Sequence, residues 1–99
     1  MIWTTPALTD AEAIRDYIAR DSPRYAADLM ARLVGAVERL AQFPESGRKV
    51  PELDRPDVRE LIVGNYRVVY RLVRQGEVVE IAAVVHAARR FPTEGFTGG

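Results

Sequence analysis

Arginine and histidine are the residues of this chain whose types and spacing could do chemistry, and they gather in its second half. Residues 59–90 carry six arginines against three glutamates, whereas residues 1–58 carry eight Lys or Arg against ten Asp or Glu. Guanidinium groups suit the recognition of planar or anionic partners. His86 is the only histidine, and an imidazole can move a proton near neutral pH. Together with Arg67, Arg89 and Arg90 it could hold a phosphate group and shuttle a proton beside it.

Several other kinds of chemistry are excluded or disfavoured by the composition. The chain has no cysteine, which excludes disulfides and thiolate metal sites. One histidine cannot form a multi-histidine metal site, and no glycine-rich phosphate motif or serine elbow is present, so we expect no metal and no cofactor. A net charge of zero argues against sequence-blind nucleic-acid binding. No apolar run approaches the roughly 20 residues that span a bilayer, and the N-terminus lacks a signal peptide, so a cytoplasmic protein is expected.

Helical periodicity fills the first half of the chain. Thr9 and Glu12 have capping-box spacing, which predicts that a first helix begins there. Ser22 is a suitable N-cap for a second helix, expected over 23–42, whose first residue is a proline. Gly35 lies inside that helix, where glycine costs about 1 kcal/mol relative to alanine. It therefore indicates a close approach by another element.

Period-two patterning replaces helical patterning from Arg59 onward and predicts strands. We expect the strands "RELIV", "YRVVYRLVR" and "EVVEIAAVVH", joined by two-residue turns at Gly64-Asn65 and Gln75-Gly76, with residues 2–4 as an edge strand. The connection 43–57 has three prolines and is expected to be irregular. The predicted fold class is α+β, an N-terminal antiparallel helical hairpin packed on a small antiparallel β-sheet. One domain over 1–92 and a flexible tail over 93–99 are expected.

Two-residue turns would fix the strand register and therefore the two faces of the sheet. The predicted core face comprises Leu61, Val63, Tyr66, Val68, Tyr70, Leu72, Val79, Ile81, Ala83 and Val85. The predicted second face comprises Glu60, Ile62, Arg67, Val69, Arg71, Val73, Val78, Glu80, Ala82, Val84 and His86.

The second face mixes aliphatic and basic side chains, which is typical of a partner-binding surface. In this register Arg71 lies opposite Glu80 and can pair with it, whereas Arg67 has no partner. The residues expected to contact a partner are Arg67, Val69, Arg71, Val73, Val84, His86, Arg89 and Arg90.

Three segments in order carry a resemblance to a known family: "FPESGRKVPEL", "RELIVGNYRVVYR" and "VVHAARRF". Together they resemble the ParE branch of the RelE/ParE toxin superfamily, over about residues 6–91. The resemblance implies a helical hairpin on a sheet (the RelE/ParE-like fold) and a toxin of a type II toxin–antitoxin module, a kind of module linked to plasmid stabilisation. It also implies an antitoxin partner in a hetero-oligomeric complex.

The family has two activities, and the residues bear on the choice between them. RelE-like members cleave messenger RNA on the ribosome, and the resemblance makes Arg67, His86 and Arg89 the catalytic candidates for that reaction. ParE-like members inhibit DNA gyrase and need no catalytic residues of their own. After its last strand this chain reads "HAARRFPTEGFTGG", without a tyrosine or a His-Tyr pair. Because arginine is too basic to shuttle protons near neutral pH, His86 would have to serve both proton steps. Gyrase inhibition is therefore favoured.

Two alternatives remain open beside the gyrase inhibitor: a ribosome-dependent endoribonuclease, and a non-toxic co-regulator of its own operon that binds antitoxin. The antitoxin's binding mode is open as well. An acidic, leucine-containing disordered segment could cover Val69, Val73 and Val84 while pairing with Arg67 and Arg71. A helix could instead lie over the helical hairpin.

Overall fold

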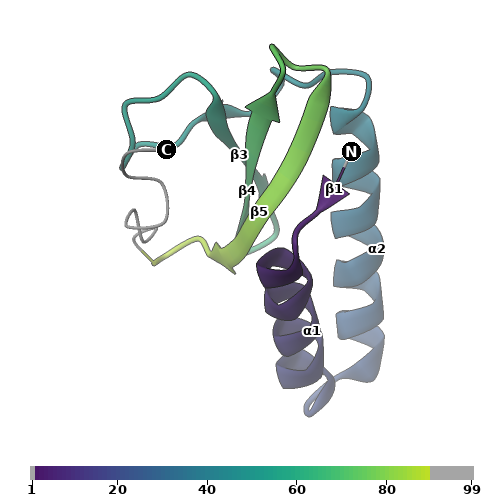
Figure 1. Cartoon of the computed structure of the whole chain (residues 1–99). Coiled ribbons are helices and arrows are strands. Elements are labelled where there is room, and N and C mark those ends of the chain that lie inside the picture. The colour runs from purple at the N-terminus through teal and green to yellow at the C-terminus, as the bar shows by residue number, and fades with distance from the viewer. Residues whose placement is uncertain (1, 90–99) are drawn as a thin grey trace.

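The computed structural model describes residues 2–89. In chain order the elements are β1 (Ile2–Trp3), α1 (Thr5–Ala19), α2 (Pro23–Leu40), β2 (Arg48–Lys49), β3 (Val58–Val63), β4 (Tyr66–Val73) and β5 (Val78–His86). The strands form one sheet in the order β1-β5-β4-β3-β2. Only β1, which runs parallel to β5, breaks the antiparallel pairing. Figure 1 shows α1 and α2 side by side on one side of this sheet. The predicted α+β class is confirmed.

The helix caps explain where both helices begin. Ser22 caps α2 as predicted, because its hydroxyl accepts a hydrogen bond from the Tyr25 backbone N–H at 3.1 Å. The first helix begins earlier than predicted, at Thr5, with Thr4 as its N-cap. The Thr4 hydroxyl accepts from the Ala7 N–H and donates to the Ile81 carbonyl at 2.7 Å. This bond to β5 is a tertiary contact, and it makes Thr4 a better cap than the locally favoured Thr9.

The sheet register agrees with the prediction around both turns. Val63 lies opposite Tyr66 across the two-residue turn, and Leu61 lies opposite Val68. Beyond the second turn, Tyr70 lies opposite Ile81 and Leu72 opposite Val79. The predicted edge strand at the N-terminus is also present, as β1.

A β-bulge at Ala82 overturns the rest of the predicted register. Val69 pairs with Ala83 and Tyr70 with Ile81, so Ala82 has no opposite residue in this ladder. A bulge adds one residue to one strand and exchanges the faces of everything beyond it. Val84 therefore packs in the helix-side core, whereas Ala83 and Val85 lie on the second face. The predicted faces of these three residues are wrong.

The main core lies between the helices and the sheet. Its largest fully buried side chains are Tyr70, Leu29, Leu33, Leu40 and Ile81. Burial of a leucine or an aromatic ring contributes about 1.5–3 kcal/mol each, so this layer supplies most of the apolar stabilisation.

The second face of the sheet carries a smaller core, which the sequence did not predict. Val50, Val58 and Val69 are fully buried there, with Leu53 packed against them. The cover comes from the 43–57 connection, drawn in teal in Figure 1 away from the helices. That connection also forms the short strand β2 against β3, where an irregular segment was expected. Among residues 2–89, no helix is long and apolar enough to cross a membrane.

Candidate functional site

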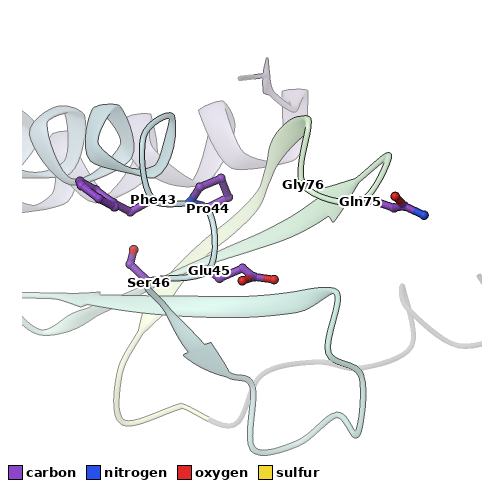
Figure 2. A pocket seen from close by; sticks show the side chains of 6 residues that line it. All are labelled: Phe43, Pro44, Glu45, Ser46, Gln75 and Gly76. Atoms are coloured by element: carbon purple, nitrogen blue, oxygen red, sulfur yellow. The ribbon is translucent and has the colours of Figure 1, made fainter.

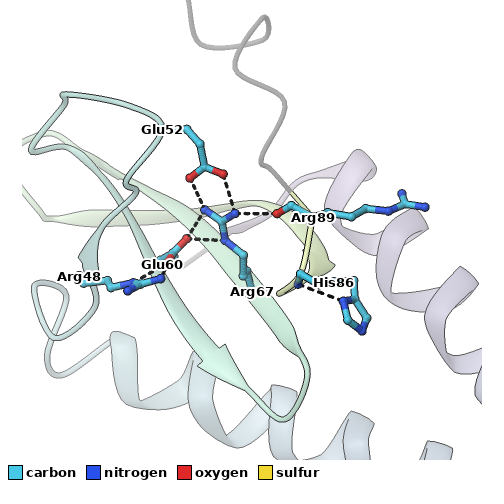
Figure 3. Close-up of polar contacts among 7 residues, drawn as sticks. Arg48, Glu52, Glu60, Arg67, His86 and Arg89 are labelled. Carbon is cyan, nitrogen blue, oxygen red and sulfur yellow. Dashed lines mark hydrogen bonds and ion pairs between the residues drawn. The ribbon is translucent and has the colours of Figure 1, made fainter.

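Arg67 on β4 is a buried residue held by carboxylates. Its side chain is 5% exposed, and its Nε donates to Glu60 Oε1 at 2.7 Å. Nη1 and Nη2 each donate to one carboxylate oxygen of Glu52 at 2.7 Å, the bidentate geometry of a strong charge-assisted pair. Nη1 also donates to the Arg89 carbonyl at 3.0 Å (Figure 3). The prediction that Arg67 lacks a partner is wrong.

Glu60 links this arginine to a second one and completes a four-residue ion cluster. The Glu60 side chain is fully buried, and its Oε2 accepts from Arg48 Nε at 2.7 Å. The ion cluster therefore comprises Arg48, Glu60, Arg67 and Glu52. Hydrogen bonds from Arg67, first to Glu52 and then to Glu60, raise the pKa of this guanidinium above its usual value despite its burial. Arg67 therefore stays charged in the folded protein.

His86 lies on the other side of the sheet from Arg67. The bulge places it opposite Tyr66, whose ring it meets edge-on at 5.5 Å between centroids. Its Nδ1 accepts a hydrogen bond from the Ala88 N–H at 3.1 Å. Figure 3 shows the imidazole pointing away from the ion cluster. The predicted grouping of His86 and Arg67 on one face is therefore wrong, because that register contained no bulge.

His86 instead lines a groove between α1 and the end of β5, here called the α1–β5 groove. Its volume is about 520 Å³. The lining residues are Asp10, Ala13, Ile14, Tyr17, Tyr66, Val84, Val85, His86 and Arg89. Tyr17 is 68% exposed at its rim, and the carboxylate of Asp10 accepts from the Val84 N–H at 3.0 Å. An apolar floor with a polar rim fits the binding of a protein segment.

The other predicted contact residues are divided between core and surface. Val69 and Val84 are buried, in the two different cores, and are not available to a partner. Arg71 pairs with Glu80 across the ladder as predicted, at 3.4 Å, and its Nε has no hydrogen-bond partner among the described residues. Val73 is half-buried and Arg89 is exposed. Arg90 and the predicted tail 93–99 lie outside the described residues.

A further pocket, of about 560 Å³, lies where α2 leads into the 43–57 connection. It is lined by Phe43, Pro44, Glu45, Ser46, Gln75 and Gly76 (Figure 2). The Tyr70 hydroxyl holds the turn at residues 44–47 against the sheet. It donates a hydrogen bond to the Pro44 carbonyl and accepts one from the Gly47 N–H, both at 2.9 Å. The lining of this pocket has one carboxylate and no basic side chain, which disfavours the binding of an anion.

The sequence did not predict that Arg67 lies in an ion cluster with Glu52, Glu60 and Arg48. One signal was available: Glu60 falls on the same predicted face as Arg67, on the adjacent strand. No comparable signal marked Glu52, because its position depends on how the irregular connection folds over the sheet.

A helical hairpin packed on a mixed five-stranded sheet, with an exposed groove between α1 and β5, defines the class of small α+β protein to which this chain belongs. The comparisons with known proteins agree with this class. The family model described as the ParE toxin of the type II toxin–antitoxin system parDE matches residues 1–91. The chain therefore belongs to the ParE toxin family, as the sequence motifs predicted.

Two proteins named as toxins and one solved toxin–antitoxin structure are also similar to this chain. The chain is 42% identical over 89 residues to Toxin RelE2 of Caulobacter vibrioides, covering 90% of this chain and 96% of that protein. It is 39% identical over 92 residues to the putative toxin Y4kP of Sinorhizobium fredii, covering 91% and 90%. The solved structure entitled "Chromosomal ParDE TA system from P. aeruginosa" matches with a TM-score of 0.67 and 26% identity, over 85% of this chain and 90% of that one.

Proposed function

We propose that this toxin inhibits DNA gyrase by binding it, and that a cognate antitoxin neutralises it in a hetero-oligomeric complex. One observation carries the proposal: the guanidinium of Arg67 is buried between two carboxylates, on the opposite face of the sheet from His86. Among residues 2–89, the arginine and the histidine that a nuclease would need do not converge. The cytoplasm, where gyrase works, is the expected place of action.

The chemistry of RNA cleavage supports the same choice. Attack by the 2′-hydroxyl requires a general base, a general acid and stabilisation of the charge on the phosphorane. For Arg67 to bind a phosphate, it would have to exchange two carboxylate partners for one anion, which would take its guanidinium away from both carboxylates. His86 remains as a single imidazole with Arg89 beside it in the α1–β5 groove. Binding through this groove needs no proton transfer.

A supercoiling assay with purified DNA gyrase tests the proposal. Toxin freed of its antitoxin should stop ATP-dependent supercoiling and cause cleaved DNA to accumulate, and added antitoxin should reverse both effects. His86→Gln should inhibit gyrase within about threefold of wild type, because inhibition by binding requires no proton transfer from the imidazole. Arg89→Glu should weaken inhibition by reversing a charge at the groove.

Three experimental results would contradict gyrase inhibition. Full supercoiling in the presence of excess folded toxin would exclude gyrase as the target. Cleavage of messenger RNA on translating ribosomes, abolished by His86→Gln, would establish the nuclease instead. If the toxin affects neither process yet binds antitoxin, the co-regulator function is left.

A further inference from the structure

Gly35, near the middle of α2, has no role that the fold itself explains. The backbone has positive φ at Gly64 and Gly76 but not at Gly35. A Cβ atom built on Gly35 would meet nothing within 4 Å. Glycine in a helix interior nevertheless costs about 1 kcal/mol relative to alanine. The predicted close approach by another element of this chain is therefore wrong, and the open space at Gly35 faces outward.

That space belongs to a groove between α2 and β3, here called the α2–β3 groove, with a volume of about 410 Å³. Its lining residues are Arg32, Gly35, Ala36, Arg39, Ile62 and Val63. Positions 32, 35, 36 and 39 recur every three or four residues and so share one face of the helix. On the strand side, Ile62 is 52% exposed. It pairs with Arg67, so its side chain belongs to the second face of the sheet and the groove meets Ile62 at the edge of the strand.

The edge of β3 is open along this groove. The ladder between β2 and β3 pairs Arg48 with Glu60 and Lys49 with Arg59, and within residues 2–89 no strand lies beside β3 beyond Glu60. Val63 and Tyr66 flank a two-residue turn and so form a hydrogen-bonded pair. By alternation, the backbone N–H and C=O of Ile62 point outward. An extended segment placed there could hydrogen-bond to the sheet.

The charge of the groove defines what such a segment must carry. Arg32 and Arg39 are exposed, and among the described residues neither guanidinium takes part in a hydrogen bond or an ion pair. They are seven positions apart along the helix, a rise of about 10 Å. Side chains of an extended chain alternate between opposite faces, and two residues advance about 7 Å. Two carboxylates two residues apart would therefore face the helix together, and the long arginine side chains can reach them across the remaining distance.

We propose that the α2–β3 groove receives an extended, acidic segment of the antitoxin, laid along β3 at Ile62 with carboxylates on Arg32 and Arg39. Because Gly35 has no side chain, the surface of α2 leaves space in the groove for that segment. This inference rests on the toxin–antitoxin part of the proposed function and is independent of gyrase as the target. Disordered segments that fold on binding commonly add a strand to an open sheet edge in this way.

Calorimetric titration of purified full-length antitoxin into toxin variants tests the proposal without any toxicity readout. Gly35→Trp should weaken the complex at least about tenfold, because the indole fills the groove. Val34→Trp is the matched control. Val34 is 51% exposed and lies about 100° round the helix from Gly35, so its replacement should leave the affinity within about threefold of wild type.

Charge reversal tests the acidic character of the segment separately. The double variant Arg32→Glu, Arg39→Glu should also lose about tenfold in affinity, and its affinity should depend less on salt than that of wild type. In wild type, hydrogen exchange at the Ile62 amide should slow when antitoxin binds. Circular dichroism and the melting temperature confirm that each variant is folded before titration.

Three outcomes would overturn the proposal. Wild-type affinity in folded Gly35→Trp would mean that the groove is empty in the complex. Loss of affinity in Gly35→Trp without loss in the arginine double variant would mean that the segment is not acidic. If Gly35→Trp binds antitoxin normally but no longer inhibits gyrase, the groove binds the target. Failure of wild-type toxin to inhibit gyrase would contradict the proposed target and leave these titrations interpretable.

Discussion

Arg67 Nε and Glu60 Oε1 lie 2.7 Å apart, on side chains that are 5% and 0% exposed. Two ions removed from water to this extent stabilise the fold only when they are paired, because each offsets part of the other's desolvation. Arg67→Ala should therefore lower the free energy of unfolding by about 3–5 kcal/mol, since it removes the buried cation that lies between the carboxylates of Glu60 and Glu52. Urea denaturation measures this loss.

Arg71→Ala is the matched control for that experiment. Arg71 lies on the same strand, but its side chain is 35% exposed and its pair with Glu80 is longer, at 3.4 Å. Its replacement should cost no more than about 1 kcal/mol. If Arg67→Ala were as stable as wild type but had lost its toxic activity, Arg67 would have a functional role and not a structural one.

Gly47 and Gly35 should respond to alanine in opposite directions. A Cβ on Gly47 would lie 2.5 Å from the Tyr70 hydroxyl oxygen and 2.6 Å from the Glu60 carbonyl oxygen. Gly47→Ala should therefore cost about 1–3 kcal/mol through overpacking. Gly35→Ala meets nothing within 4 Å and should stabilise the helix by about 1 kcal/mol.

Melting temperatures of the two alanine variants check this pair. For a domain of this size, 1 kcal/mol corresponds to about 4–8 °C. Gly47→Ala should melt several degrees below wild type and Gly35→Ala several degrees above it. Destabilisation by Gly35→Ala would contradict the conclusion that the fold does not need this glycine.

The fold was predictable from sequence to the extent that it depends on local patterns. Period-two alternation and the Gly64-Asn65 turn predicted the register on either side of that turn, and Ser22 with Pro23 predicted the start of α2. The site was less predictable, because one inserted residue determines which face of the sheet the end of β5 presents. Ala82 adds to β5 without an opposite residue, and an extra alanine in an apolar strand has no sequence signature. It moves His86 away from Arg67.

The burial of Arg67 was unpredictable for a different reason. Glu52 comes from a connection rich in proline, and its position follows from tertiary packing of Val50 and Leu53 on the sheet. No local rule places such a carboxylate. A basic residue in a predicted strand was therefore interpreted as a contact for a partner, whereas it holds the connection in place.

Asp10 should stabilise the bulged part of β5. Its carboxylate accepts a hydrogen bond from the Val84 N–H at 3.0 Å, on the side of β5 where β1 has already ended. Asp10→Ala should cost about 1–3 kcal/mol, because it leaves a part-buried backbone donor without its charged acceptor. Asp16→Ala is the control: within the described part of the chain, Asp16 pairs only with its neighbour Arg15, and it is exposed, so its change should stay within about 0.5 kcal/mol. Equal urea midpoints for the two variants would contradict the role of Asp10.

Tyr70 should make the protein sensitive to alkaline pH. Burial raises the pKa of its hydroxyl, which donates to the Pro44 carbonyl and must stay protonated to do so. Because the folded pKa lies above the unfolded value of about 10, this group's contribution to stability is complete below about pH 10 and is lost as the pH rises through the folded pKa. The free energy of unfolding, measured from pH 8 to pH 11, should therefore fall at the alkaline end.

Tyr70→Phe separates this titration from other alkaline effects. At pH 8 it should cost about 1–3 kcal/mol, because the Pro44 carbonyl and the Gly47 N–H both lose their partner. Above pH 10 the variant should lose less further stability than wild type does, since the buried phenol is gone. Tyr25→Phe is the control: Tyr25 is 47% exposed, and its variant should keep the wild-type alkaline slope. Parallel slopes for wild type and Tyr70→Phe would assign the alkaline loss to other groups.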